Sequence, residues 1–325
     1  MTEPRGTSGA RLAFYVTAPG RTATVDIAIR GAAALLTIAL PLALGVYLVR
    51  KLKAGWRLWL VGAATFVGSQ VLHVPFNLAV LNPVMARLGF GVDARPGPAL
   101  AAAALLLGLS AGVFEEGARW IAYRFFIRRA RSWGEGVTFG AGHGGAEALL
   151  AGVGALATLV QLSALRGQDL AEVVPAAQLA AAQQQFDLFW SMPGWSFFFA
   201  SVERASALGV QMTLAVMVLQ AFRRRRGWLW FVAAIGWHAA VDAAAVFVGV
   251  TTGVYAGSAS GIVVTEVLIG VMAAASLGML FRMREPASPA ALPPVPPAHT
   301  GPVGAAPTTS EHVRDSRYAN PGGAP

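Results

Sequence analysis

The sequence predicts an all-α protein, a polytopic transmembrane bundle of about seven membrane-spanning helices. Of its 325 residues, 55% are hydrophobic and only 13% are charged, and the mean hydropathy is +0.56. A soluble domain needs more charge than this to cover its surface. Apolar runs of about 20 residues, long enough to cross a bilayer, recur along the chain between short arginine clusters. The predicted solvent is therefore the lipid bilayer.

The apolar runs define the predicted helices and the domain organisation. Between the fourth and fifth runs, residues 164–192 form an expected extracytoplasmic connection with a partly helical stretch. An N-terminal extracytoplasmic segment (1–25) precedes the membrane domain (26–282), and a Pro/Ala-rich tail (283–325) follows it. The tail is predicted to be disordered because it has almost no large apolar residues. The seven runs are residues 26–49, 58–81, 98–126, 136–163, 194–221, 228–250 and 258–281.

Basic residues predict the orientation in the membrane. Strongly basic connections at 50–57, 124–131 and 223–226 alternate with weakly charged ones. The positive-inside rule places them in the cytoplasm, which puts the N-terminus outside and the C-terminus inside. Arg30 and other N-terminal arginines oppose this assignment, but the three later clusters agree with one another. Tryptophans near the predicted helix ends are expected at the membrane interfaces: Trp56, Trp59, Trp133, Trp195, Trp228 and Trp230.

Composition also excludes several classes of function. The net charge of +9 comes from clusters between apolar runs, so no nucleic-acid-binding face is expected. The chain has no cysteine, which excludes disulfides, thiolate metal sites and a cysteine nucleophile. A serine mechanism is not favoured, because Ser132, Ser191 and Ser201 have no obvious base at catalytic spacing. A hydrolytic reaction would therefore use an activated water.

Several ionisable residues fall inside the predicted membrane helices. Each costs about 2.5–3.5 kcal/mol on insertion scales, so each is a functional candidate. Glu115 and Glu116 are adjacent on the third helix, and Arg119 follows one turn later. At helical spacing Glu115 and Arg119 share a face and are expected to pair, with Glu116 about 100° away. The other candidates are His143 and Glu147 on the fourth helix, Glu203, Arg204 and Gln211 on the fifth, and His238 and Asp242 on the sixth.

The depths of these residues coincide. At about 1.5 Å per residue, Glu116, Gln211 and His238 lie about 15 Å from the predicted cytoplasmic helix ends, and His143 about 11 Å. A shared level is what one site between helices requires. We therefore expect these side chains to meet in a cavity open toward the cytoplasmic half. His73 is interpreted as a histidine that hydrogen-bonds a carbonyl, and Glu203–Arg204 fits a structural pair as well as a functional one.

The motifs together resemble the YhfC family of intramembrane proteases, which is related to PrsW and to the CAAX-protease and bacteriocin-processing (CPBP) group. The resemblance covers about residues 20–282. It implies a multi-pass protein of the bacterial plasma membrane that hydrolyses a membrane-protein or lipopeptide substrate. The motifs are Glu115-Glu116-x-x-Arg119, Phe139-x-x-x-His143 with Glu147, Glu203-Arg204 and His238-x-x-x-Asp242.

The resemblance implies that Glu115, Glu116, His143 and His238 are catalytic. Either glutamate would activate a water, and the histidines would position the water and the oxyanion. One residue departs from the family pattern, because Gln211 occupies a position where a histidine is expected. Glutamine is a poor metal ligand and cannot act as a base. The sequence therefore favours a mechanism without a cofactor.

Three alternatives stay open. A zinc-dependent version would use His143, His238 and Glu116 as ligands. A catalytically inactive binding or scaffolding protein of the same fold would explain Gln211. A proton or metal transporter would also use buried carboxylates and histidines, although the sequence shows no inverted repeats.

Overall fold

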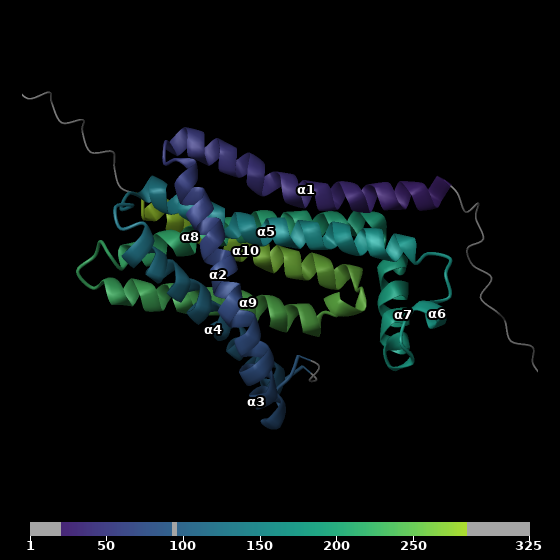
Figure 1. Cartoon of the computed structure of the whole chain (residues 1–325). Coiled ribbons are helices and arrows are strands. Elements are labelled where there is room, and N and C mark those ends of the chain that lie inside the picture. Colours follow the sequence, from purple (N-terminus) through teal and green to yellow (C-terminus); the bar gives the residue numbers. More distant parts are fainter. Residues whose placement is uncertain (1–20, 93–95, 285–325) are drawn as a thin grey trace, which may run out of the picture. The chain divides into compact units, whose positions relative to one another are not determined.

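The computed structural model describes residues 21–92 and 96–284, and the regular secondary structure within these residues is helical (Figure 1). Predictions for residues 1–20 of the N-terminal segment and 285–325 of the tail lie outside the described residues. The elements are α1 (Arg21–Leu52), α2 (Trp56–Phe76), the π-helix η1 (Asn77–Leu81), α3 (Asn82–Arg87), α4 (Pro98–Ile121), the π-helix η2 (Ala122–Phe126), α5 (Trp133–Ala164), α6 (Leu170–Val173), α7 (Ala176–Ser191), η3 (Gly194–Phe197), α8 (Phe198–Gln220), α9 (Gly227–Thr251), η4 (Val254–Ala256) and α10 (Ala259–Arg282).

The all-α prediction is confirmed. Within the described residues, seven helices are long and apolar enough to cross a membrane, and they coincide with the seven predicted runs to within a few residues at most ends. The largest difference is in the second span, which continues to Arg87. Pro75 removes a backbone donor there, and the chain continues through the wider turn of η1.

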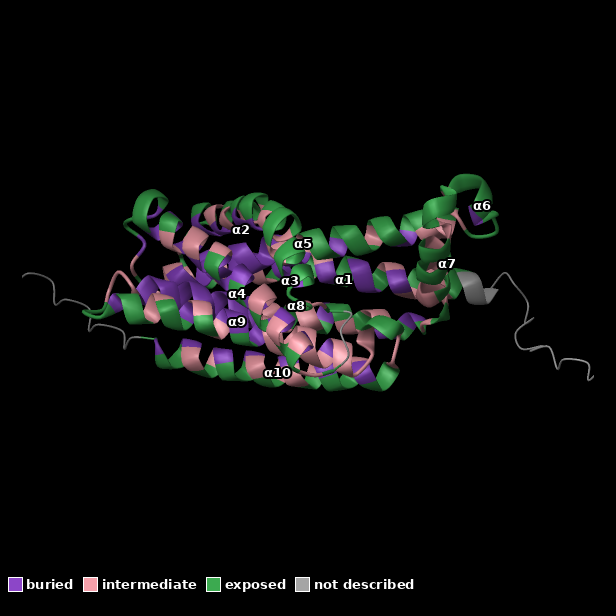
Figure 2. Ribbon diagram, turned by 90° about the horizontal axis from the view of Figure 1, so that it is seen from below, coloured by how far each residue is buried: buried purple, intermediate pink, exposed green. Residues whose placement is uncertain are grey.

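Helix α5 packs against α1, α2 and α8, while α4 packs against α9 and α10 covers α8 and α9. Helices α2 and α4 run obliquely across the others (Figure 1). Burial is continuous over residues 136–146 of α5 and 208–220 of α8. Both stretches adjoin the connections that carry the arginine clusters, and Figure 2 shows buried residues concentrated in that half of the bundle. The most continuously buried part of the described bundle is therefore the half next to the arginine-rich connections, and it extends as far as His143 and Gln211.

Glycines let α2 and α5 approach at the backbone. A Cβ atom on Gly142 would collide with the carbonyl of Trp59, and one on Gly62 with the carbonyl of Phe139. Close backbone approach of this kind is typical of helices packed in membranes. The Trp59 indole lies over Gly145 and is only 6% exposed. The prediction that Trp59 is an interfacial anchor is wrong, because the glycine face of α5 accommodates its ring.

Arg30 attaches the 164–192 connection to α1. Its guanidinium is buried, pairs with Asp26 at 2.8 Å, and donates hydrogen bonds to the carbonyls of Phe189 (2.8 Å) and Met192 (2.6 Å). These carbonyls belong to the C-terminal end of α7, where a cation is favourable. The predicted partly helical stretch is thus present as α6 and α7. The ion pair and hydrogen bonds of Arg30 are structural contacts, and they explain why a basic residue is present at this end of α1.

Gly142 and Gly154 provide a matched test of the α2–α5 contact, since both lie on α5 but only Gly142 faces a backbone. We expect Gly142→Ala to lower the free energy of unfolding by about 1–3 kcal/mol through overpacking. Gly154→Ala has open space around the new methyl group and should be neutral or slightly stabilising. Thermal unfolding in detergent micelles, followed by circular dichroism, measures both. Equal midpoints for the two variants would contradict the backbone contact.

Candidate active site

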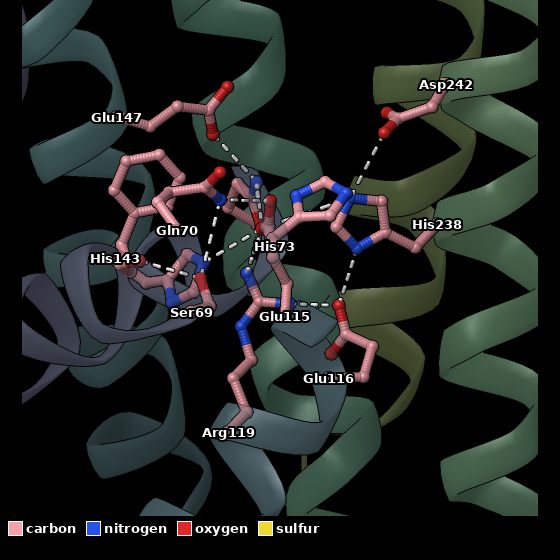
Figure 3. Close-up of polar contacts among 12 residues, drawn as sticks. Ser69, Gln70, His73, Glu115, Glu116, Arg119, His143, Glu147, His238 and Asp242 are labelled. Carbon is pink, nitrogen blue, oxygen red and sulfur yellow. Dashed lines mark hydrogen bonds and ion pairs between the residues drawn. The ribbon is translucent and has the colours of Figure 1, made fainter. Parts of the chain in front are cut away.

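Glu115 lies where four helices meet (Figure 3). Its Oε1 atom accepts a hydrogen bond from Gln70 Nε2 on α2 at 3.0 Å. Its Oε2 atom lies 3.0 Å from His143 Nε2 on α5 and 3.5 Å from Gln211 Nε2 on α8. Glu115 itself comes from α4. One buried carboxylate therefore connects α2, α4, α5 and α8.

Glu116 has different partners from its neighbour. Its Oε1 atom accepts hydrogen bonds from Arg119 and, at 2.7 Å, from His238 Nδ1. Arg119 is fully buried and also donates to Gln211 Oε1, while its guanidinium lies 3.8 Å from Glu115 Oε2. The predicted pairing of Arg119 with Glu115 is confirmed as an ion pair at 3.8 Å, but the closer carboxylate partner of Arg119 is Glu116. Residues three and four apart share a helix face, and Gln70 and His143 already bind Glu115.

His238 stands between the two glutamates. While its Nδ1 atom binds Glu116, its Nε2 atom is 4.0 Å from Glu115 Oε2 and 3.5 Å from Asp242 Oδ2. The structure thus brings together Glu115, Glu116, His143 and His238, the four residues predicted as catalytic. Asp242 joins them at one side, as its spacing on α9 predicts.

Gln211 links this cluster to a second one. Its Nε2 atom donates to Glu147 Oε2 at 2.8 Å, and Glu147 in turn accepts a hydrogen bond from Arg204 at 2.6 Å. Arg204 also pairs with Glu203. The amide of Gln211 therefore connects the other three supporting residues, Glu147, Glu203 and Arg204, to Glu115 and Arg119.

Exposure increases toward one end of the bundle. The side chains of Glu116 and His143 are 0% exposed, that of His238 is 4% and that of Glu115 is 8%. Going away from the arginine-rich connections, the exposed fractions rise: Arg204 20%, Glu147 23%, Glu203 36% and Asp242 40%. This gradient is the reverse of the predicted opening toward the cytoplasmic half. On that side the site is closed by the buried stretches of α5 and α8.

Sequence reasoning missed the contribution of α2. Gln70 binds Glu115, and His73 Nε2 lies 3.0 Å from Asn77 Nδ2. The prediction that His73 binds a carbonyl is wrong, because the Asn77 amide one turn later reaches its ring. Ser110 on α4 donates to Asn77 Oδ1 at 2.7 Å. The signal was present in the sequence: Gln70, His73 and Asn77 are spaced by three and four residues within an apolar run, which places them on one helix face.

An apolar groove with a volume of ≈ 560 Å³ lies between α2 and α4, beside the site. Gly68 and Ser69 of α2 and Phe114 and Gly117 of α4 are among the residues that line it. Ser69 accepts a hydrogen bond from Gln70, which binds Glu115. Helices α2 and α4 therefore line the groove and also carry residues of the carboxylate cluster.

The residues fit a metal ion in type but not in arrangement. Histidine and glutamate are ordinary zinc ligands. However, the described residues contain no group of three or more His, Asp or Glu side chains placed to hold a metal ion. Glu116 contacts Nδ1 of His238, whereas Glu115, which binds His143, lies 4.0 Å from the Nε2 atom of His238. The Arg119 cation lies 3.8 Å from Glu115. A fixed positive charge beside a ligand opposes cation binding.

Comparison with known proteins identifies the family to which the chain belongs. Residues 36–280 match the family model described as YhfC intramembrane metalloprotease. The chain is 31% identical over 217 residues to "Uncharacterized membrane protein YhfC" of Bacillus subtilis (strain 168), an alignment that covers 63% of this chain and 77% of that protein. No solved structure matches the chain. The relation to PrsW and the CPBP group stays a prediction. Because the family model matches most of the chain, from within the first apolar helix to near the end of the seventh, this integral membrane protein belongs to the YhfC intramembrane metalloprotease family.

Proposed function

We propose that this protein is an intramembrane endopeptidase that hydrolyses peptide bonds of membrane-associated substrates with a water activated by Glu115. The supporting observation is the different surroundings of two adjacent buried glutamates. Glu116 is held by Arg119 and His238, whereas Glu115 faces the Nε2 atoms of His143 and His238. A cluster of this kind is costly in a membrane, so it is more often functional than structural.

Glu115 is the general base in this mechanism. It takes one proton from a water, and the resulting hydroxide attacks the carbonyl carbon, forming a C–O bond and a tetrahedral oxyanion. Glu115 then delivers the proton to the amide nitrogen as the C–N bond breaks. The products are a carboxyl group and an amine, and Glu115 returns to its carboxylate form. No external reactant besides water is consumed.

The histidines orient the reacting groups. His143 lies 3.0 Å from Glu115 Oε2 and fixes the orientation of that carboxylate. His238 directs Nε2 toward the same oxygen from 4.0 Å, close enough for the imidazole to contact a water or oxyanion lying between them. Glu116 is a positioning residue, because it acts through the Nδ1 atom of His238. Asp242 orients the same ring from its other side.

Gln211 is compatible with the metal-free version of this mechanism. Its carbonyl oxygen accepts a hydrogen bond from Arg119, and its amide nitrogen donates one to Glu147. Gln211 thereby connects the cluster around Glu115 to the cluster around Arg204. These contacts require a donor and an acceptor, which the amide supplies. The family description as a metalloprotease favours the metal-dependent alternative. For that alternative we propose zinc, with His143, His238 and Glu116 as its ligands.

Substrate and water would reach the site by different routes. The apolar groove between α2 and α4 suits a membrane-associated segment, since small residues there permit close approach of another chain. Water would enter at the partly exposed end near Glu147 and Asp242. With the arginine-rich connections in the cytoplasm, the C-terminus is cytoplasmic and the partly exposed end faces the opposite side of the membrane.

A second candidate is a catalytically inactive binding protein of the same fold. Gln211 favours it, since the resemblance described above leads us to expect a histidine at this position. Such a protein would retain the buried cluster for structural reasons and would bind partners without cleaving them.

Glu115→Gln tests the proposed function. Loss of the base should reduce the cleavage rate by about 10²–10⁴-fold. The readout is new N-termini, identified by mass spectrometry, in a membrane-protein mixture reconstituted with the purified protein in proteoliposomes. Glu172→Gln, the same change on an exposed residue of α6, should keep the wild-type rate. A Glu115→Gln protein with the wild-type rate would exclude the mechanism. Stable partners without any new N-termini in the wild-type sample would support the inactive binding protein.

Metal analysis tests the choice between the two chemistries. We expect the purified protein to contain much less than one zinc per chain, and we expect chelators to leave its cleavage rate unchanged, because no three acidic or histidine side chains among residues 21–92 and 96–284 are placed to hold a metal ion. Stoichiometric zinc, together with inactivation by a chelator and recovery on adding zinc, would contradict the metal-free version.

Filling the groove tests the substrate route. Gly68→Leu and Gly117→Leu place side chains in open space, since no atom lies within 4 Å of the added Cβ. Both variants should fold and should raise KM for membrane-embedded substrates by an order of magnitude or more, because each new leucine side chain fills part of the groove that the substrate would occupy. Gly278→Leu on α10, equally unobstructed but outside the groove, is the control. Equal KM values in all three variants would show that substrates do not use this groove.

A further inference from the structure

His73 belongs to a chain of hydrogen bonds that defines its tautomer. Ser110 Oγ donates to Asn77 Oδ1 at 2.7 Å, and the amide nitrogen of Asn77 lies 3.0 Å from His73 Nε2. An amide nitrogen donates hydrogen bonds and does not accept them. His73 Nε2 is therefore an unprotonated acceptor, and the proton of the neutral ring is on Nδ1.

The Nδ1–H group of His73 is buried and has no hydrogen-bond partner within the described part of the chain. The side chain is 8% exposed. A buried donor without a partner costs about 1–3 kcal/mol, so such a group needs an explanation. The neighbouring π-helix η1 adds a second sign of function, since it begins at Asn77 and such turns are frequent at functional sites.

The ring of His73 lies beside the candidate active site. It stacks on Phe114, the residue before Glu115, with 5.3 Å between the ring centres. Glu115, His238 and Asp242 are within electrostatic range of the ring. Figure 3 shows His73 among the side chains of this cluster. An unused donor thus adjoins the carboxylate proposed to activate water.

We infer that His73 Nδ1–H donates a hydrogen bond to the carbonyl oxygen of the scissile peptide and stabilises the oxyanion that forms there. This inference rests on the proposed endopeptidase function. A donor aimed at the developing charge typically contributes about 10²–10³-fold to the rate. Asn77 and Ser110 are positioning residues, because they hold the ring in the tautomer that carries the proton on Nδ1.

The tautomer can be measured independently of cleavage. Nitrogen-15 NMR of the full chain with labelled histidine should show His73 protonated at Nδ1, with its signal assigned by its loss in His73→Gln. Asn77→Asp replaces the donor with a carboxylate that only accepts, so it should move the proton to Nε2. Asn82→Asp, the same change at an exposed position nearby, should leave the spectrum unchanged. A wild-type His73 protonated at Nε2 would overturn the inference.

Kinetics test the role of the donor. His73→Phe and Asn77→Asp should each lower kcat by about 10²–10³-fold with little change in KM, because the donor acts on the transition state. Asn77→Asp keeps the imidazole in place, so its loss of rate would not come from a missing ring. If both variants cleave at the wild-type rate while Glu115→Gln is inactive, this inference is wrong and the proposed function stands. If Glu115→Gln also cleaves normally, the proposed function is wrong, and this inference with it.

Discussion

Arg119 carries a permanent positive charge into the interior of the bundle, and the side chains around it are arranged to neutralise it. Removing a guanidinium from water costs several kcal/mol unless hydrogen bonds and opposite charge replace the solvent. Glu116 supplies the carboxylate, Gln211 supplies a carbonyl oxygen, and Glu115 lies 3.8 Å away. Because Gln211 belongs to α8 and Glu116 also binds His238 of α9, this single charge ties α4 to two other helices.

The backbone contact between α2 and α5 serves the same site from the other side. Glycine at position 142 lets α5 lie directly against α2, and the next residue, His143, reaches Glu115. The same approach brings Gln70 of α2 to the other oxygen of that carboxylate. A bulkier residue would separate the helices and lengthen both contacts. The backbone contact between α2 and α5 thus determines how Gln70 and His143 hold the Glu115 carboxylate.

The two adjacent glutamates illustrate how surroundings divide similar residues between roles. They differ by one position on α4, yet one is bound by a cation and the other faces two imidazoles. Helical geometry makes this possible, since neighbouring residues point about 100° apart and so meet different helices. The two carboxylates therefore contact different atoms of the partners that they share, Arg119 and His238.

The sequence by itself determined the seven helices, their approximate ends and the ionisable residues of the cluster on α4, α5, α8 and α9, because apolar runs of membrane length and charges within them are local signals. Tertiary structure decided the pairing of Arg119 with Glu116, the burial of Trp59 and the place of His73. Each depends on which helix lies opposite and how closely it approaches. Spacing along one helix fixes the face on which a residue lies, but the partner across the interface is set by packing between helices.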